Sequence, residues 1–240
     1  MEKDELINYF HSIGEEYYFI ELQKNKIFFP DYTVLTNILS FVLSIILSAA
    51  YFYIAKNYFL TNGPTIRTTF TLNDVYSTTI ICFVALFFYS LNKIKRYIVI
   101  DLNNSCIFIE FHFFSIKIKT KTINKNDILQ IGNNIFPTNS KFKTKGYRSF
   151  KKLDPDKETN LFYTYSVSFL LNNGKTQNIV IGPHDEDYEI SAAISKNISN
   201  YFNIPHITCN KGNVLNIKER FNSFEFEAIP SDNTKRISNR

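Results

Sequence analysis

Two long uncharged stretches dominate the hydrophobic pattern of the N-terminal part of the chain. The first runs from Thr33 to Ala55 and the second from Val75 to Asn92. As helices they would be roughly 34 Å and 27 Å long, against about 30 Å for the hydrocarbon core of a bilayer. Two buried helices of a water-soluble protein are the alternative, but helices that are apolar on all sides over this length need a much larger protein around them. The pattern therefore predicts a two-helix transmembrane hairpin over residues 33–92.

Small polar residues mark one face of the first predicted helix. Ser40, Ser44 and Ser48 recur at every fourth position, so they lie above one another along the helix. Small residues let a neighbouring membrane helix approach closely. We therefore predict a helix-packing face at these serines, toward the second helix or a partner subunit. Ion and proton pathways normally need an ionisable group within the membrane, and neither stretch contains one, which argues against transport by this chain alone.

Basic residues near the ends of the two stretches predict their orientation, because loops rich in Lys and Arg stay in the cytoplasm. The outer flanks carry more of these residues than the connecting loop does. They are Lys24, Lys26, Lys93, Lys95 and Arg96 in the flanks, and Lys56 and Arg67 in the loop. We therefore expect an integral protein of the cytoplasmic (inner) membrane with two spans and both termini in the cytoplasm.

Beyond the second stretch the apolar residues alternate with polar ones, which is typical of half-buried strands in an antiparallel sheet. Between Ser115 and Ile123 the alternation places Lys117, Lys119 and Lys121 on one face. The other expected strands of this region cover Tyr97–Leu102, Cys106–Phe111 and, as a short candidate, Asp127–Ile131, with a tight turn at Asn103–Asn104.

A hairpin and a helix are predicted near the end of this region. Asn172-Asn173-Gly174 separates two alternating runs, Tyr163–Leu171 and Lys175–Ile181, and Asn-Gly is a strong hairpin signal. Three carboxylates, at 185–187, then favour a helix N-terminus. The apolar stripe of that helix is formed by Ile190, Ile194, Ile198, Tyr201 and Phe202, and Pro205 ends it.

The order of these elements resembles the bacterial pleckstrin-homology-like (PH-like) membrane proteins that begin with a two-helix transmembrane hairpin. The resemblance covers about residues 33–205 and is carried by Tyr97–Asp101, Asn126–Ile131 and Asn173–Lys175, followed by the amphipathic helix. It implies an α+β domain in which a curved antiparallel sheet, or split barrel, is capped by a C-terminal helix. The matching motifs are core positions and imply no catalytic residue.

These patterns divide the chain into four parts. Residues 1–32 form an N-terminal cytoplasmic segment, in which Leu6, Phe10 and Ile13 predict a short helix, followed by strand-like pieces. The transmembrane hairpin covers 33–92. The PH-like domain covers 93–205 and contains a basic insertion at about 137–160. Residues 206–240 are expected to be a polar C-terminal tail that is loosely held, or ordered only against a partner.

Composition and motifs point away from enzyme chemistry. The net charge of +5 is too small to indicate a nucleic-acid-binding protein. The chain has three Cys without a CxxC pair and four His without a metal-binding spacing, and it lacks phosphate-binding glycine loops and nucleophile motifs. We therefore expect a non-enzymatic protein without cofactor or metal.

Two functions remain as hypotheses. In the first, the PH-like module binds another membrane or cytoplasmic protein, as a subunit or assembly scaffold of a membrane complex. In the second, the module senses anionic lipid through a basic surface, although a solvated loop balanced by nearby acidic residues explains the basic insertion equally simply. The residues of that surface are Lys117, Lys119, Lys121, Lys141, Lys143, Lys145, Arg148, Lys151 and Lys152.

Overall fold

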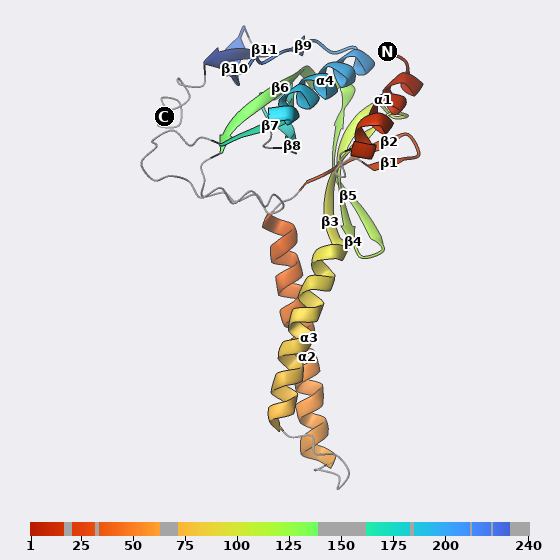
Figure 1. The fold of residues 1–240 in the computed structure, drawn as a ribbon, viewed down its shortest axis with the longest axis vertical. Coiled ribbons are helices and arrows are strands. Elements are labelled where there is room, and N and C mark those ends of the chain that lie inside the picture. Colours follow the sequence, from red (N-terminus) through yellow and green to blue (C-terminus); the bar gives the residue numbers. More distant parts are fainter. Residues whose placement is uncertain are drawn as a thin grey trace. The chain divides into compact units, whose positions relative to one another are not determined.

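The computed structural model describes residues 1–16, 21–31, 34–62, 72–138, 162–182, 185–211, 213–221 and 223–230. Its elements are mixed helices and strands (Figure 1). In chain order they are α1 (Lys3–Glu16), β1 (Glu21–Gln23), β2 (Lys26–Pro30), α2 (Val34–Asn62), α3 (Leu72–Lys93), β3 (Ile94–Asp101), β4 (Cys106–Phe113), β5 (Ile116–Asn124), a 3-10 turn (Lys125–Asp127), β6 (Ile128–Thr138), β7 (Phe162–Leu171), β8 (Thr176–Gly182), α4 (Asp185–Phe202), β9 (His206–Ile207), β10 (Asn213–Arg220) and β11 (Ser223–Pro230).

The chain divides into two compact units. Unit 1 contains residues 1–31, 98–109 and 121–240, and unit 2 contains 32–97 and 110–120. The N-terminal segment is therefore not a separate part of the protein, because α1, β1 and β2 belong to the same unit as the later strands. The boundary also runs through β3, β4 and β5, whose ends next to the helical hairpin belong to unit 2.

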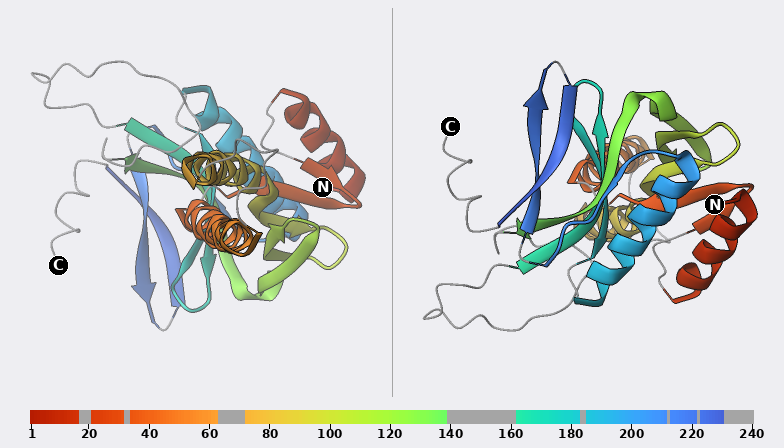
Figure 2. Two further views of the ribbon diagram at one scale, coloured as in Figure 1. Left: turned by 90° about the horizontal axis from the view of Figure 1, so that it is seen from below. Right: turned by 90° about the horizontal axis from the view of Figure 1, so that it is seen from above.

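Helices α2 and α3 form the hairpin of unit 2 and lie side by side, as an end-on view shows (Figure 2). Ring contacts from Phe41 to Phe83 and from Phe52 to Tyr76 show that the helices run antiparallel. The hydroxyl of Tyr51 also lies 3.3 Å from Thr78 Oγ1. Both uncharged stretches are thus helical, as predicted.

The strands of unit 1 build a four-stranded sheet of order β8-β7-β6-β9, and β1 to β5 follow one another in a second sheet. The pairs β6–β7 and β7–β8 are antiparallel, whereas the short β9 pairs parallel to β6. Helix α4 lies against β6, β7 and β8. The α+β class, the antiparallel sheets and the helix after the last predicted hairpin are as expected, but the described strands do not close into a barrel.

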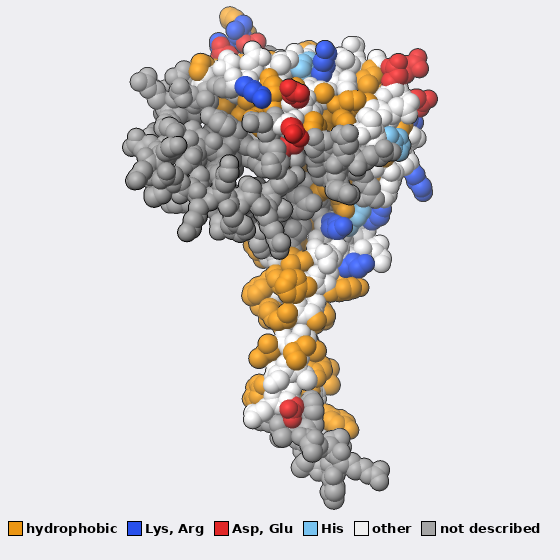
Figure 3. All heavy atoms as spheres, in the orientation of Figure 1, with side chains coloured by type: hydrophobic (Ala, Val, Ile, Leu, Met, Phe, Trp, Pro, Cys, Tyr) orange, Lys and Arg blue, Asp and Glu red, His pale blue; other side chains and the backbone are white. Residues whose placement is uncertain are grey.

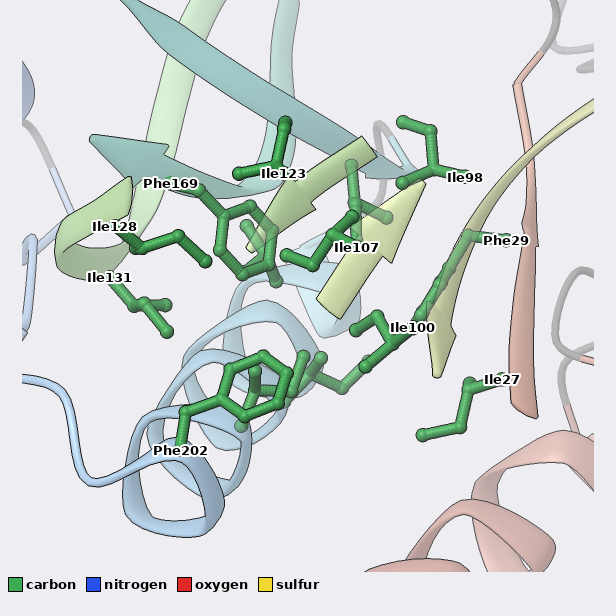
Figure 4. Packing of buried hydrophobic residues seen from close by; sticks show 14 of the residues in the cluster. Ile27, Phe29, Ile98, Ile100, Ile107, Ile123, Ile128, Ile131, Phe169 and Phe202 are labelled. Atoms are coloured by element: carbon green, nitrogen blue, oxygen red, sulfur yellow. The ribbon is translucent and has the colours of Figure 1, made fainter. Parts of the chain in front are cut away.

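One hydrophobic core joins the elements of unit 1. Ile194, Ile198 and Phe202 of the predicted helical stripe are fully buried. Leu6 and Phe10 bring α1 into the same cluster, which confirms the amphipathic pattern at the N-terminus. Figure 4 shows buried side chains of this core from β2, β3, β4, β5, β6, β7 and α4. Those labelled are Ile27, Phe29, Ile98, Ile100, Ile107, Ile123, Ile128, Ile131, Phe169 and Phe202.

The predicted hairpin at Asn172–Gly174 connects β7 and β8. Gly174 has a φ of +73°, in the left-handed region that favours glycine. A Cβ at this position would lie 2.8 Å from two ring carbons of Phe224 in β11. A residue without a side chain is therefore needed here for packing as well.

The C-terminal region is more ordered than the sequence indicated. The expected polar tail contributes β9, β10 and β11, and β10 and β11 pair along their whole length.

Side-chain amides of β6 attach this C-terminal region to the rest of unit 1. Asn133 donates to the carbonyl of Cys209 and accepts its N–H, both at 2.9 Å, and Asn134 Oδ1 accepts the N–H of Leu215 at 2.9 Å. Gln130 Oε1 accepts the N–H of Phe226 at 2.7 Å. The expectation of a loosely held tail is therefore wrong for the described residues between 206 and 230.

Asp101 stabilises the turn between β3 and β4, where the sequence predicted one. Its buried carboxylate accepts the backbone N–H groups of Asn103 and Asn104 at 3.0 and 3.2 Å, and the side-chain amide of Asn104 at 2.9 Å. Lys26 Nζ lies 3.8 Å away. Burial raises the pKa of this carboxyl, but these hydrogen bonds and the Lys26 charge outweigh it and hold the pKa below 3.8.

We expect Asp101→Asn to destabilise the protein at pH 7 by about 1 to 3 kcal/mol, because the amide replaces a charged acceptor of several N–H groups. A depressed pKa contributes stability that is fully present above pH 3.8 and is lost as the pH falls through the folded-state pKa. The difference in melting temperature between Asp101→Asn and the unaltered chain in detergent should therefore shrink in acid. A constant difference between pH 7 and pH 3 would contradict this assignment.

Candidate functional site

The helical hairpin has an inverted distribution of apolar and polar side chains. Two segments, Thr36–Tyr58 and Asn73–Lys93, are long and apolar enough to cross a membrane. In the most apolar stretch of each segment, only 17% and 11% of the residues, respectively, are buried. On the face seen in Figure 3, hydrophobic side chains project along the described part of the hairpin, and many of them are exposed. The helices therefore lack the burial that core helices of a water-soluble protein have.

The serines of the predicted packing face are buried in this hairpin. Ser40, Ser44 and Ser48 are at most 5% exposed, whereas their apolar neighbours Ile45 and Ile46 are exposed. Ser40 and Ser44 each donate a hydrogen bond to the carbonyl four residues earlier, so their hydroxyls are satisfied within α2. The buried face of α2 thus carries small side chains, beside the ring contacts of Phe41 and Phe52 with α3, and large apolar side chains such as Ile45 and Ile46 are exposed.

The turn between β4 and β5 lies beside the C-terminal end of α3. The backbone N–H of Phe114 donates to the carbonyl of Lys93, the last residue of α3, at 3.1 Å. The rings of Tyr89 and Phe114 are 5.9 Å apart. Phe114 has a φ of +56°, so the turn adopts a backbone conformation that is uncommon for a large side chain. These contacts place the turn at the point where the second predicted span ends.

Strand β5 is exposed on both faces, and Ile123 is its only buried residue. Lys117, Lys119 and Lys121 are exposed as one face. On the other face Ile116 and Ile118 are 60% and 49% exposed. The prediction of a half-buried strand is wrong, because β5 is the last strand of its sheet and most of it extends beyond the core. The result is a basic and apolar surface, which we call the β5 surface: Phe114, Ile116, Lys117, Ile118, Lys119 and Lys121.

A polar pair lies close to this surface on β4. Glu110 Oε1 is 2.5 Å from His112 Nε2, and the ring of His112 is 4.7 Å from that of Tyr97. The guanidinium of Arg96 lies over the ring of Phe111 at 5.5 Å. This pair was not predicted, although residues two apart on a strand share a face, so the spacing of Glu110 and His112 carries a signal for it.

Ser195 and His206 also approach each other, with Oγ and Nε2 at 2.9 Å. The hydroxyl of Ser195 donates its single proton to the carbonyl of Ala192 at 2.9 Å, so the imidazole is placed to donate to the serine rather than to activate it. Burial, with a smaller effect from Lys196, lowers the pKa of His206. This geometry is that of a structural contact between α4 and β9.

The described residues contain no group of three or more His, Cys, Asp or Glu side chains that is placed to hold a metal ion. A hollow of about 210 Å³ lies between α1 and the β1–β2 hairpin, next to His11, Lys24 and Leu102. Of the predicted basic surface, only the part on β5 is described. Lys141, Lys143, Lys145, Arg148, Lys151 and Lys152 lie outside the described residues.

The chain was also compared with known proteins. No family model matches the sequence, and no curated protein matches it. The features of the chain that bear on function are the exposed helical hairpin and the β5 surface.

Proposed function

We propose that the α2–α3 hairpin anchors this chain in a membrane, with both termini in the cytoplasm. The observation that supports this most strongly is the inverted burial of α2, where serines are buried and isoleucines are exposed. In water such exposed apolar area is unfavourable by about 25 cal/mol per Å², whereas lipid solvates it. A helix also satisfies its own backbone hydrogen bonds, as the membrane interior requires. The greater number of basic residues in the outer flanks supports the cytoplasmic side for the termini.

In this proposal the rest of the chain is a PH-like module that binds another protein, as a subunit or assembly scaffold of a membrane complex. Its antiparallel strands and the covering helix α4 support the PH-like architecture. The engagement of Asp101, His112 and Ser195 in structural contacts supports a non-enzymatic role. A module tethered next to the membrane is also suited to hold a partner there, because tethering raises the local concentration of its binding surface.

Extraction and purification of the full-length chain test these two statements separately. An alkaline carbonate wash should leave the chain in the membrane pellet, and release into the supernatant would rule out the anchor. After purification in mild detergent, a partner protein should elute with the chain at fixed stoichiometry in size-exclusion chromatography. A strictly monomeric chain without a co-eluting protein would contradict the scaffold role and leave the anchor intact.

The β5 surface favours a second candidate function, the recognition of anionic lipid. Three lysines alternate there with apolar side chains, next to the end of a proposed span. Its test is the vesicle experiment described below.

A further inference from the structure

We propose that the β4–β5 hairpin is a second membrane-contacting element. Phe114, Ile116 and Ile118 enter the interfacial layer of the bilayer, and Lys117, Lys119 and Lys121 bind the phosphate groups of anionic lipids. This inference rests on the proposed insertion of α2 and α3, since that insertion fixes the depth of the turn.

The position of the turn is the first argument. Phe114 is hydrogen bonded to Lys93, the residue at which the second predicted span ends, and its ring contacts Tyr89 one turn earlier in α3. All three residues belong to unit 2, so the placement does not depend on how the two units are arranged. When α3 crosses a bilayer, its C-terminal end emerges into the headgroup layer, and the turn lies at that level.

The exposure of apolar side chains is the second argument. Phe114, Ile116 and Ile118 are 37%, 60% and 49% exposed, and Tyr89 and Phe88 continue the exposed apolar surface down α3. Contiguous exposed apolar surface usually marks a contact with a partner or a membrane. Aromatic side chains such as these favour the interface between lipid and water. The apolar surface of the proposed span thus continues onto the β4–β5 hairpin.

Charge is the third argument. Unit 2 contains two acidic residues, Asp74 and Glu110. Asp74 lies at the other end of α3, and Glu110 is hydrogen bonded to His112. The basic residues of unit 2 near the turn are Lys93, Lys95, Arg96, Lys117 and Lys119, with Lys121 next in the strand. Long lysine stems can lie along apolar surface while the ammonium group reaches the phosphates. The turn is therefore electrostatically complementary to an anionic lipid surface.

The same strand is poorly suited to pair with a strand of another protein. Lysines along an edge strand are a common way in which proteins prevent such pairing. β5 is the last strand of its sheet among the described residues and carries a lysine at every second position from 117 to 121. These features favour lipid as the occupant of the β5 surface.

The chain contains no tryptophan, so a single introduced Trp reports on one site. Phe114→Trp probes the turn, and Phe88→Trp probes the outer surface of α3, where Phe88 is exposed. The full-length variants are reconstituted in vesicles of phosphatidylcholine and phosphatidylglycerol, with or without bromine on the acyl chains near the headgroup. We expect bromine to reduce the Trp emission of both variants by about twofold, as for side chains held at the interface.

Charge dependence is measured in the same vesicles. The quenching of Phe114→Trp should decrease when phosphatidylglycerol is omitted, and it should decrease similarly at about 1 M salt, where the Debye length is about 3 Å. Combining Phe114→Trp with Lys117→Gln, Lys119→Gln and Lys121→Gln should reduce quenching to the level in neutral vesicles. The matched control removes three exposed lysines of unit 1, with Lys24→Gln, Lys175→Gln and Lys196→Gln, and should keep the original quenching.

Each outcome separates this inference from the proposed anchor. Quenching of Phe88→Trp without quenching of Phe114→Trp would overturn the inference and leave the anchor in place, whereas absence of both would overturn the anchor. Equal effects of the two triple variants would overturn the role of the β5 lysines. A blue-shifted Phe114→Trp emission that bromine does not quench would show a protein contact and would also overturn the inference. If Phe114→Trp fails to fold, Ile118→Trp probes the same surface.

Discussion

Val84→Asp in α3 should reverse the side of the membrane on which the C-terminal part of this chain lies. Val84 is near the middle of the Asn73–Lys93 segment and is exposed on the hairpin. An aspartate at the centre of a span is unfavourable by about 2.5 to 3.5 kcal/mol, which shifts the insertion equilibrium on the order of 100-fold. If α3 no longer inserts, α2 alone crosses the membrane and everything after it emerges on the opposite side.

The chain contains a natural reporter for this change, since Asn197-Ile198-Ser199 is an N-glycosylation sequence. When the full chain is translated with microsomes, the unaltered protein should stay unglycosylated if its C-terminal part lies in the cytoplasm, as proposed. Val84→Asp should be mostly glycosylated, and Val84→Ile should behave like the unaltered chain. Glycosylation of the unaltered chain would show that the predicted orientation is wrong, and an unglycosylated Val84→Asp would show that α3 tolerates the charge or does not span.

Phe169→Ala should destabilise unit 1 by about 3 to 5 kcal/mol, because a buried ring is replaced by a cavity. Phe169 is on β7, is fully buried, and belongs to the core cluster that also contains Phe202 of α4. At the usual sensitivity of proteins of this size, the melting temperature should fall by about 6 to 20 °C. The measurement is thermal unfolding of the full-length chain in detergent.

Val180→Ala is the matched control for this change. Val180 lies on the neighbouring strand β8 and is half exposed, so its truncation should change the melting temperature by far less. Similar shifts for the two variants would indicate that the sheet is not packed around Phe169 as described.

Membrane contact at two places would restrict the orientation of unit 2. The α2–α3 hairpin alone could rotate about its own axis, whereas a β4–β5 turn held at the headgroup layer through Phe114 and Lys117 would select one face toward the lipid. Unit 2 held in this way would present the same surface to every partner, which is consistent with the proposed scaffold role.

Local sequence signals were sufficient for most elements. The uncharged stretches, the Asn-Gly hairpin at Asn173–Gly174 and the apolar stripe ending at Phe202 each depend on residues close in the chain, and the structure has the helices, the turn and the buried stripe at these places. The sequence also indicated which face of α2 is buried. Ser40, Ser44 and Ser48 share one helix face by their spacing alone, and all three are buried.

Other features depended on which segments become neighbours. The sequence shows that Lys and Ile alternate in β5, but whether either face is covered depends on the position of the strand at the edge of its sheet. Likewise, no local pattern indicates that Asn133 and Asn134 bind the backbone of Cys209 and Leu215, about eighty residues later. The segment β10–β11 is held by side-chain amides of β6. Such contacts leave no strong hydrophobic pattern in the sequence, so the strands were not predicted.

The amino-acid sequence alone thus determined the two apolar helices, most strands and the absence of a metal-binding spacing, since periodicity and local turn preferences act within a few residues. Only the tertiary structure decided that α1 joins the main core, that the C-terminal strands dock on β6, and that the β5 surface is exposed beside the end of α3. Burial is a property of neighbours in space, and the chain brings these neighbours together from positions that no local pattern connects.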